Sequence, residues 1–313
     1  MKLNKPKFWD TKFSFISFLL IPFSLMVIFF IFLKKKIIKS KKFNIPVICV
    51  GNLYIGGTGK TPVSIFLARE LSKLNKRPAI VRKFYKNHID EHSMIRKKFK
   101  NLVLEKNRMN GLKVAEREKY DIAILDDGFQ DCSIKKDLNI LCFNQNQLIG
   151  NGLVLPAGPL RESLISLKEA NIILINGEKN LMFEKKLLSI NSNLEIFYSK
   201  YKPKNLNQFK GKRLFALAGI GNPRNFFELL EENNLIVEKK LSYPDHYVFN
   251  DREIQNILDD AKDKNLQIIM TEKDYYKVKN FNKGQIHYLE VELEIAEKEN
   301  FIKKIIKLYD QNN

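Results

Sequence analysis

The chain has 313 residues, 44% of them hydrophobic, which is enough to bury one large or two moderate cores. Its formal net charge is +19, from 54 basic and 35 acidic residues, but only ten of the basic residues are Arg. Because Lys is spread along the whole chain and no Arg-rich, aromatic stripe is present, we expect no nucleic-acid partner. An anionic membrane surface suits the charge better. Cys49, Cys132 and Cys142 have no CxxC spacing, so we expect neither a disulfide nor a metal role for them.

The first long feature is an uncharged, mostly apolar run at residues 13–33, which is long enough to span a bilayer. A cleaved signal peptide is a poorer interpretation, because the run is too long and no small-residue cleavage site follows it. Pro22 and three serines leave room for a kinked helix that lies partly in one leaflet. The lysine-rich residues 34–42 are expected on the cytoplasmic side. We therefore expect residues 1–40 to anchor the protein to the membrane; a buried soluble helix is the alternative.

A glycine-rich turn follows the next predicted element, an uncharged β-branched strand at residues 45–50. The sequence VGNLYIGGTGKTP places strand, glycines, lysine and threonine in the order of a phosphate-binding loop, although Tyr54 stands where GxxxxGK[ST] needs Gly. Backbone N–H groups of the glycines would turn toward a polyphosphate, Lys60 would reach its terminal phosphates, and the Thr61 hydroxyl would hold Mg²⁺. The predicted phosphate-binding residues are Gly56, Gly57, Thr58, Gly59, Lys60, Thr61 and Pro62.

Pro62 is expected to open a helix at residues 63–74, whose positive N-terminal end also favours an anion. The alternative is a glycine-rich turn from strand to helix without a ligand. That alternative leaves the paired lysine and threonine unexplained.

Two acids follow a further uncharged run, residues 122–125, which predicts a buried strand. Ligands bind at the carboxyl edge of a doubly wound sheet. We therefore expect Asp126 and Asp127 to face the phosphate-binding loop, where one of them would hold Mg²⁺ or its waters. An acid pair that caps a helix is the alternative.

Alternating strands and helices continue to about residue 201, and the polar residues 202–212 are the best candidate for a linker. Beyond them, strand and helix patterns recur and predict a second, smaller α/β domain. The expected organisation is a membrane-anchoring helix at residues 1–40, a phosphate-binding domain at 41–208 and the smaller domain at 209–313.

The ordered set of motifs resembles the tetraacyldisaccharide 4'-kinase family, the lipid A 4'-kinases of Gram-negative bacteria. The resemblance covers nearly the whole chain: the apolar N-terminus, then VGNLYIGGTGKTP, VRKFY with IDEHSMI, ILDDGFQ, LPAGPLRES, AGIGNPRNFF, SYPDHYVF and MTEKDYYKV. It implies a P-loop NTPase-like, mostly parallel sheet. It also implies transfer of the γ-phosphoryl group of ATP to the 4'-hydroxyl of a membrane-held acylated glucosamine disaccharide 1-phosphate, at the cytoplasmic face of the inner membrane.

The resemblance also implies roles for three residues outside the phosphate-binding loop. The family's catalytic base maps to Asp90, its acidic neighbour near the metal maps to Glu91, and a histidine that pairs with the base maps to His246. Such a pair, divided between two domains, would assemble fully only on domain closure. The chain departs from the family where Arg82 is followed by no glycine-rich stretch, and where Asp131 replaces a histidine at the end of the DDGFQ motif.

Two other classes of function compete with a kinase. A membrane-associated switch ATPase of the partitioning type shares a GGTGKT-like loop, but it carries a signature lysine where this chain has Ile55. A membrane protein that binds polyanions through its lysines would have no catalysis. ATP consumption that depends on added lipid disaccharide separates all three.

Overall fold

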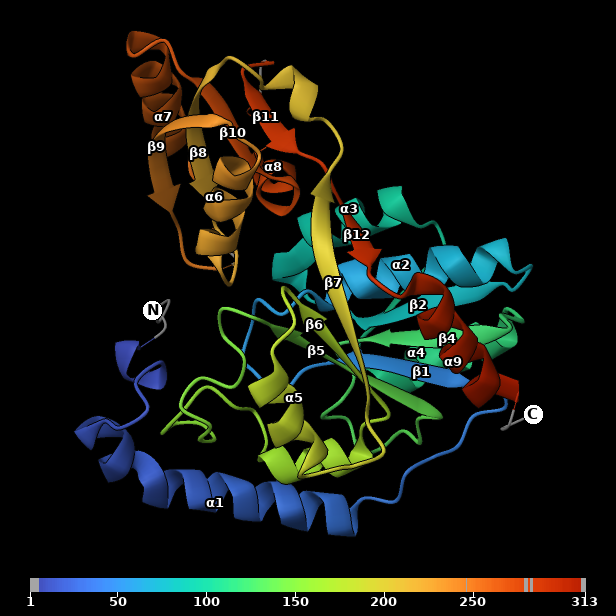
Figure 1. The fold of residues 1–313 in the computed structure, drawn as a ribbon. Coiled ribbons are helices and arrows are strands. Elements are labelled where there is room, and N and C mark those ends of the chain that lie inside the picture. The colour runs from blue at the N-terminus through green and yellow to red at the C-terminus, as the bar shows by residue number, and fades with distance from the viewer. Residues whose placement is uncertain (1–5, 246, 279–280, 282–283, 311–313) are drawn as a thin grey trace. The chain divides into compact units, whose positions relative to one another are not determined.

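The computed structural model describes residues 6–245, 247–278, 281 and 284–310 (Figure 1). The chain divides into two compact units, and each is described by itself. Among the described residues, the larger unit contains 6–84, 99–200 and 293–310, and the smaller unit contains 85–98 and 201–292.

This division is more interwoven than the one expected from the sequence. Residues 85–98 cluster with the smaller unit, and the C-terminal residues 293–310 cluster with the larger one. The expected domain boundaries at residues 40 and 208 stay a prediction.

The larger unit is built on an eight-stranded sheet with the order β12-β7-β6-β5-β1-β4-β2-β3. From β3 to β7 every neighbouring pair is parallel. The strands are β1 Val47–Gly51, β2 Pro78–Lys83, β3 Leu102–Glu105, β4 Ile122–Asp126, β5 Leu138–Asn144, β6 Ile172–Asn176, β7 Glu195–Pro203 and β12 Val291–Ile295. The mostly parallel sheet predicted from the sequence is therefore confirmed.

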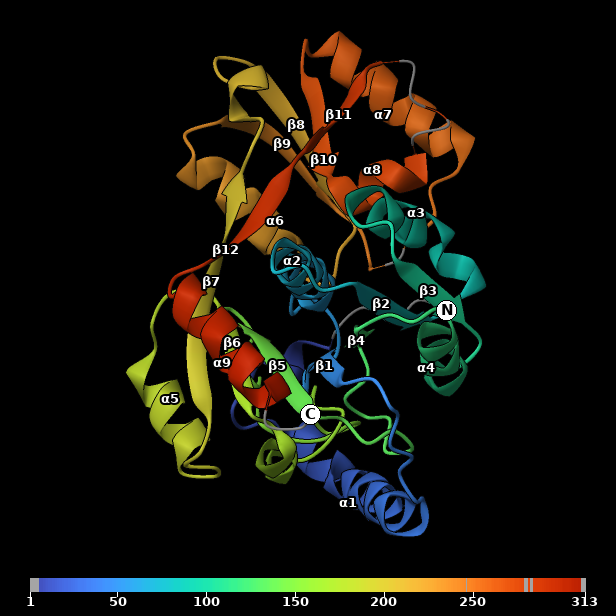
Figure 2. The ribbon, with the colours of Figure 1, turned by 90° about the vertical axis from the view of Figure 1, so that its right-hand side faces the viewer.

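Helices cover both faces of this sheet, which is why β1 and β4 are buried throughout and contain hardly any polar residues. Figure 2 shows α2 (Lys60–Lys73) and α4 (Arg108–Arg117) on opposite faces. Alternate residues of β1, among them Val47 and Cys49, share a core cluster with Leu112 of α4. In the strand order, β1 lies between β5 and β4, and the chain continues from β1 toward β2 on one side and from β4 to β5 on the other. The carboxyl end of β1 is therefore a topological switch point, where ligands commonly bind in sheets of this kind.

The helix at the N-terminus, α1 (Phe15–Ile37), is long and apolar enough to cross a membrane by length and composition, and little of it is buried. One side of it is tied to the larger unit. The Ser24 hydroxyl donates to the Val154 carbonyl oxygen at 2.8 Å and accepts from the Ala157 N–H at 3.0 Å. Toward the C-terminal end of α1, the Lys35 ammonium contacts Glu162 at 2.7 Å. Figure 1 shows α1 lying along the edge of the unit, consistent with these contacts.

The remaining helices of the larger unit are α5 (Leu181–Leu188) and α9 (Lys298–Asp310), with short 3₁₀ turns at Lys7–Trp9 and Leu164–Glu169. The ring of Phe301 in α9 lies 5.1 Å from that of Phe197 in β7, so the C-terminal helix joins the core of the larger unit.

The smaller unit is a three-layer α/β arrangement around a parallel sheet with the order β11-β10-β8-β9. Alternate residues of β8 face two separate cores: Ala216 packs with Phe226 of α6, and Phe215 packs with Ile254 of α7. Its elements are η2 Lys86–His88, α3 Ile89–Lys98, η4 Leu206–Gln208, β8 Arg213–Ala218, α6 Pro223–Glu232, β9 Ile236–Ser242, α7 Asp251–Asp263, β10 Gln267–Thr271, α8 Glu272–Val278 and β11 Ile286–Leu289.

The polar segment after β2 forms η2 and α3. One local expectation is wrong. The helix α2 begins at Lys60, before Pro62, with Gly59 as its N-cap. A proline is accommodated in the first turn because the N–H groups there have no partner within the helix.

Replacing Ser24 by Ala should lower the stability of the larger unit, because the buried Ala157 N–H and Val154 carbonyl oxygen lose their partner. We expect a loss of about 1–3 kcal/mol, visible as a lower unfolding midpoint of the detergent-solubilised protein. The exposed Ser40 is the matched control, and Ser40→Ala should leave the midpoint unchanged. Equal midpoints for both variants would contradict the assigned role of Ser24.

Candidate functional site

The loop between β1 and α2 is shaped by glycines in left-handed backbone conformations. Gly56, Gly57 and Gly59 have φ angles of 75°, 58° and 84°, which residues with a Cβ rarely adopt. Gly59 has no side chain to cap the first N–H groups of α2. Those groups, together with the positive end of the helix dipole, are therefore available to an anionic ligand.

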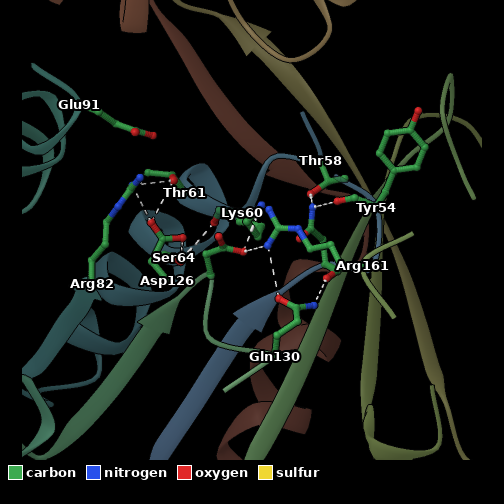
Figure 3. A network of polar contacts seen from close by, with 12 residues as sticks. Tyr54, Thr58, Lys60, Thr61, Ser64, Arg82, Glu91, Asp126, Gln130 and Arg161 are labelled. Atoms are coloured by element: carbon green, nitrogen blue, oxygen red, sulfur yellow. Dashed lines mark hydrogen bonds and ion pairs between the residues drawn. The ribbon is translucent and has the colours of Figure 1, made fainter. Parts of the chain in front are cut away.

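Polar contacts from neighbouring segments hold this loop in place (Figure 3). The Asn52 side-chain amide donates to the Thr58 hydroxyl at 2.9 Å and to the Tyr54 carbonyl oxygen, and the Gln130 amide donates to the Asn52 carbonyl oxygen at 2.7 Å. Tyr54 itself is fully buried. The residue that breaks the common glycine pattern therefore serves as a core residue that anchors the start of the loop.

The carboxylate of Asp126, at the end of β4, lies against the first turn of α2. It accepts from the Thr61 hydroxyl at 3.0 Å, from the Ser64 hydroxyl at 3.3 Å and from the Arg82 guanidinium at 3.0 Å, and its residue is only 1% exposed. The same Arg82 nitrogen lies 3.3 Å from the Thr61 hydroxyl oxygen. A threonine hydroxyl and a carboxylate thus meet at one point, and hard oxygen donors of this kind suit Mg²⁺.

The next carboxylate, Asp127, lies among three cations. Its Oδ1 atom is 2.9 Å from the Arg161 guanidinium and 3.4 Å from the Lys60 ammonium, and its carbonyl oxygen accepts from Arg108. Burial raises the pKa of the Asp127 carboxyl. The positive charges of Lys60, Arg161 and Arg108 lower it by more, so the pKa lies below its ordinary value. Asp127 is therefore ionised at neutral pH and holds the Lys60 and Arg161 side chains beside the loop.

Together these residues form a partly buried site at the carboxyl edge of the sheet, in which the cations Lys60, Arg82 and Arg161 lie beside two carboxylates. Backbone N–H groups, Lys60, Arg82 and Arg161 can bind a polyphosphate, since each offers donors to phosphate oxygens. The Thr61–Asp126 pair lies beside them and can hold the cation that accompanies a nucleotide triphosphate. This arrangement is suited to phosphoryl transfer.

The predicted site residues fall into three groups. Gly56 to Pro62, Asp126 and Asp127 lie together in the larger unit. Asp90 and Glu91 lie in α3 of the smaller unit, and His246 lies outside the described residues. The proposed pairing of Asp90 with His246 is therefore still a prediction, but the chain on both sides of residue 246 belongs to the same unit as α3.

Sequence reasoning did not assign Arg82 and Arg161 to the site. Arg82 comes from the end of β2, so the rule that found Asp126, a polar residue following a buried strand, also applied to it. Arg161 comes from a long loop and shows no such signal. Asp131, which departs from the family histidine, accepts from the Ser133 hydroxyl at 2.6 Å and lies 3.8 Å from Arg108, so it supports the neighbouring loop.

Comparisons with known proteins point to one family. A family profile described as Tetraacyldisaccharide-1-P 4'-kinase matches residues 16–310. The tetraacyldisaccharide 4'-kinase of Pelagibacter ubique (strain HTCC1062) is 43% identical over 318 residues and 100% of both chains. That of Rickettsia typhi (strain ATCC VR-144 / Wilmington) is 32% identical over 324 residues, 98% of this chain and 99% of the relative.

Among solved structures, the "apo" form of LpxK from Aquifex aeolicus in complex with ATP has a TM-score of 0.70, over 94% of this chain and 99% of that chain. At 24% sequence identity this likeness shows a common fold. The predicted fold class, a P-loop NTPase-like mostly parallel sheet with a second α/β part, is thereby confirmed.

The lowered pKa of Asp127 predicts a pH-dependent contribution to stability. Its ionised form stabilises the fold above the ordinary carboxyl pKa, and this contribution is lost as the pH falls through the lowered value. Asp127→Asn should therefore lower the unfolding midpoint at pH 7, by an amount corresponding to about 1 kcal/mol, and the difference from wild type should shrink toward pH 3. Asp263→Asn, at an exposed position, is the control. A difference independent of pH would show that the ion pairs of Asp127 do not contribute.

Proposed function

This chain belongs to the tetraacyldisaccharide 4'-kinase family, and we propose that it transfers the γ-phosphoryl group of ATP to the 4'-hydroxyl of an acylated glucosamine disaccharide 1-phosphate in lipid A biosynthesis. The observation that carries this function is the phosphate-binding loop, with Lys60 and Thr61 in the first turn of α2 and Asp126 and Asp127 beside them. The names of the full-length relatives favour the kinase over a partitioning-type switch ATPase.

We propose that the triphosphate of ATP is bound along the residues Gly56 to Pro62. The left-handed glycines leave backbone N–H groups for the phosphate oxygens, and Lys60 neutralises the terminal phosphates. Lys60 lies 3.4 Å from Asp127, and its side chain is 13% exposed, so this cation is held near the loop before any nucleotide binds. Arg82 and Arg161 add positive charge that stabilises the oxygens of the transferred group.

The oxygen donors beside the loop fit a magnesium ion. We propose that Thr61 and Asp126 hold it, with Asp127 and Glu91 as further candidates. Among the described residues no three His, Cys, Asp or Glu side chains cluster as a metal site. That suits Mg²⁺, which commonly takes one or two protein ligands and completes its shell with water and phosphate oxygens. When bound, the ion would neutralise charge on the β- and γ-phosphates.

The chemical step joins the 4'-hydroxyl oxygen to the γ-phosphorus while the bond from that phosphorus to the β-phosphate oxygen breaks and ADP leaves. We propose that Asp90 takes the proton of the hydroxyl and that His246 pairs with Asp90. Support comes from the family resemblance and from the membership of both chain segments in one unit. The pair would therefore be carried by the smaller unit as a whole, in contrast to the expectation that it is divided between domains.

The helix α1 is proposed as the anchor to the cytoplasmic face of the inner membrane. Its contacts with the rest of the unit run from Ser17, which Asn151 contacts at 3.1 Å, to Lys35. These two residues are about 27 Å apart along a helix. Because one side is bound to protein over this length while Phe18 and Phe29 are 72% and 56% exposed, we propose that α1 lies in the plane of the interface.

Incubation with labelled ATP and a purified acylated disaccharide 1-phosphate tests the function, with the new phosphate located by mass spectrometry. We expect phosphate at the 4'-position only when the lipid is present. Lys60→Ala should lower the transfer rate by at least about 10²-fold, because the charge beside the terminal phosphates is lost. Lys113→Ala, at an exposed position of α4, is the control. Turnover of ATP without the lipid would favour a switch ATPase, and full activity of Lys60→Ala would contradict the loop assignment.

Membrane binding tests the role of α1. Replacing Phe18 and Phe29 together by Asn should weaken co-sedimentation with vesicles of mixed neutral and anionic phospholipids by at least about tenfold, since two exposed rings no longer enter the apolar layer. Met182→Asn is the control, because Met182 is 85% exposed on α5. Undiminished binding of the double variant would contradict the placement of these two rings of α1 in the interface.

A further inference from the structure

A lysine of the smaller unit contacts the neighbours of both residues proposed for the chemical step. Lys273 is the second residue of α8, directly after β10. Its ammonium nitrogen lies 3.0 Å from Asp245 Oδ1 and 4.0 Å from Glu91 Oε1. Asp245 precedes His246, and Glu91 follows Asp90, so one cation lies close to two segments that are about 150 residues apart in the sequence.

Partial burial and two carboxylate partners restrict the position of the Lys273 ammonium group. The side chain of Lys273 is 20% exposed, that of Glu91 10% and that of Asp245 29%, so the contacts are partly screened from water. Burial lowers the pKa of the Lys273 ammonium, but the carboxylates of Glu91 and Asp245 raise it above its ordinary value. Lysine at this position therefore carries a charge that neutralises two carboxylates, which without it would repel each other.

The element that carries Lys273 is itself firmly attached. Asp274, the next residue, is fully buried and accepts from the Thr271 hydroxyl and the Gly219 N–H, each at 2.7 Å. On the other side of α8, Glu272 forms an ion pair with Lys98 of α3. Figure 2 shows α3 and α8 side by side. The base of the Lys273 side chain is thus held by the sheet edge, while its tip reaches toward α3 and the loop after β9.

We propose that Lys273 is a positioning residue for phosphoryl transfer: it joins α3, the helix that carries the proposed base Asp90, to the loop at Asp245, and so supports removal of the proton from the acceptor hydroxyl. This inference rests on the proposed function. Lys273 itself touches neither ATP nor the lipid in this role. Displacement of a catalytic group by about 1 Å can cost about 10²-fold in rate, so loss of the cation should act mainly on the chemical step.

The test compares three variants under saturating ATP and lipid. Lys273→Met keeps the apolar stem and removes the charge, and it should lower kcat by about 10²-fold with KM for ATP unchanged. Lys273→Arg keeps the charge and should restore most of the rate. Lys98→Met removes the neighbouring ion pair between α3 and α8 without touching Asp245 or Glu91, and it should leave kcat unchanged. Unfolding midpoints of all three variants show whether a lost rate reflects a lost fold.

A second comparison separates positioning from a general structural effect. If Lys273 acts through Asp90, adding Lys273→Met to the Asp90→Ala variant should lower the rate of phosphoryl transfer by less than about threefold. This rate is measured in single turnovers at high enzyme concentration. Full activity of Lys273→Met beside an impaired Asp90→Ala would overturn the inference and leave the proposed function intact. Equal losses from Lys98→Met and Lys273→Met would overturn it as well. An active Asp90→Ala would instead count against the proposed base.

Discussion

The contacts of the Asp126 carboxylate are the constraint on which the proposed nucleotide site depends. This group is almost completely withdrawn from water, and a buried carboxylate is tolerated only when it is paired and hydrogen-bonded. Its partners come from the first two turns of α2 and from the end of β2, and they precede Asp126 by 44 to 65 residues in the sequence. Folding of the larger unit therefore brings Thr61 and Arg82 to the end of β4.

The neighbouring Asp127 links these contacts to the part of the unit that carries α1. Its ion pair with Arg161 holds the loop at residues 153–163, which contains Pro156 and Pro159, against the glycine-rich loop. The next residue of that loop, Glu162, pairs with Lys35 of α1. One loop thus contacts both the apolar helix and the residues around Lys60. For a kinase whose acceptor is a lipid, this continuity would place the proposed nucleotide site at a defined position relative to α1, the proposed membrane anchor.

The smaller unit shows how far a site can depend on long-range folding. The segment of Asp90 reads as an exposed polar loop in the sequence, because its charges and its lack of apolar periodicity hide α3. Its helix is stabilised by α8, through the ion pair of Lys98 with Glu272 and the contact of Glu91 with Lys273. Ion pairs between distant segments do not produce a periodic pattern in the local sequence. The membership of this segment in the smaller unit could therefore not be predicted from the sequence.

Local sequence patterns were sufficient for the parallel sheet, for the glycine-rich turn from β1 to α2 and for the apolar helix. Each depends on spacing within a short stretch: buried β-branched runs, glycines before Lys60 and Thr61, and a long uncharged segment. The strand β7 and the edge strand β12 beside it were not foreseen, since they alternate more and less buried residues and form only against their neighbours. The ion pairs of Arg161 and Lys273 were likewise decided only by the tertiary structure, because the position of a charge relative to a distant partner is fixed by packing and not by sequence spacing.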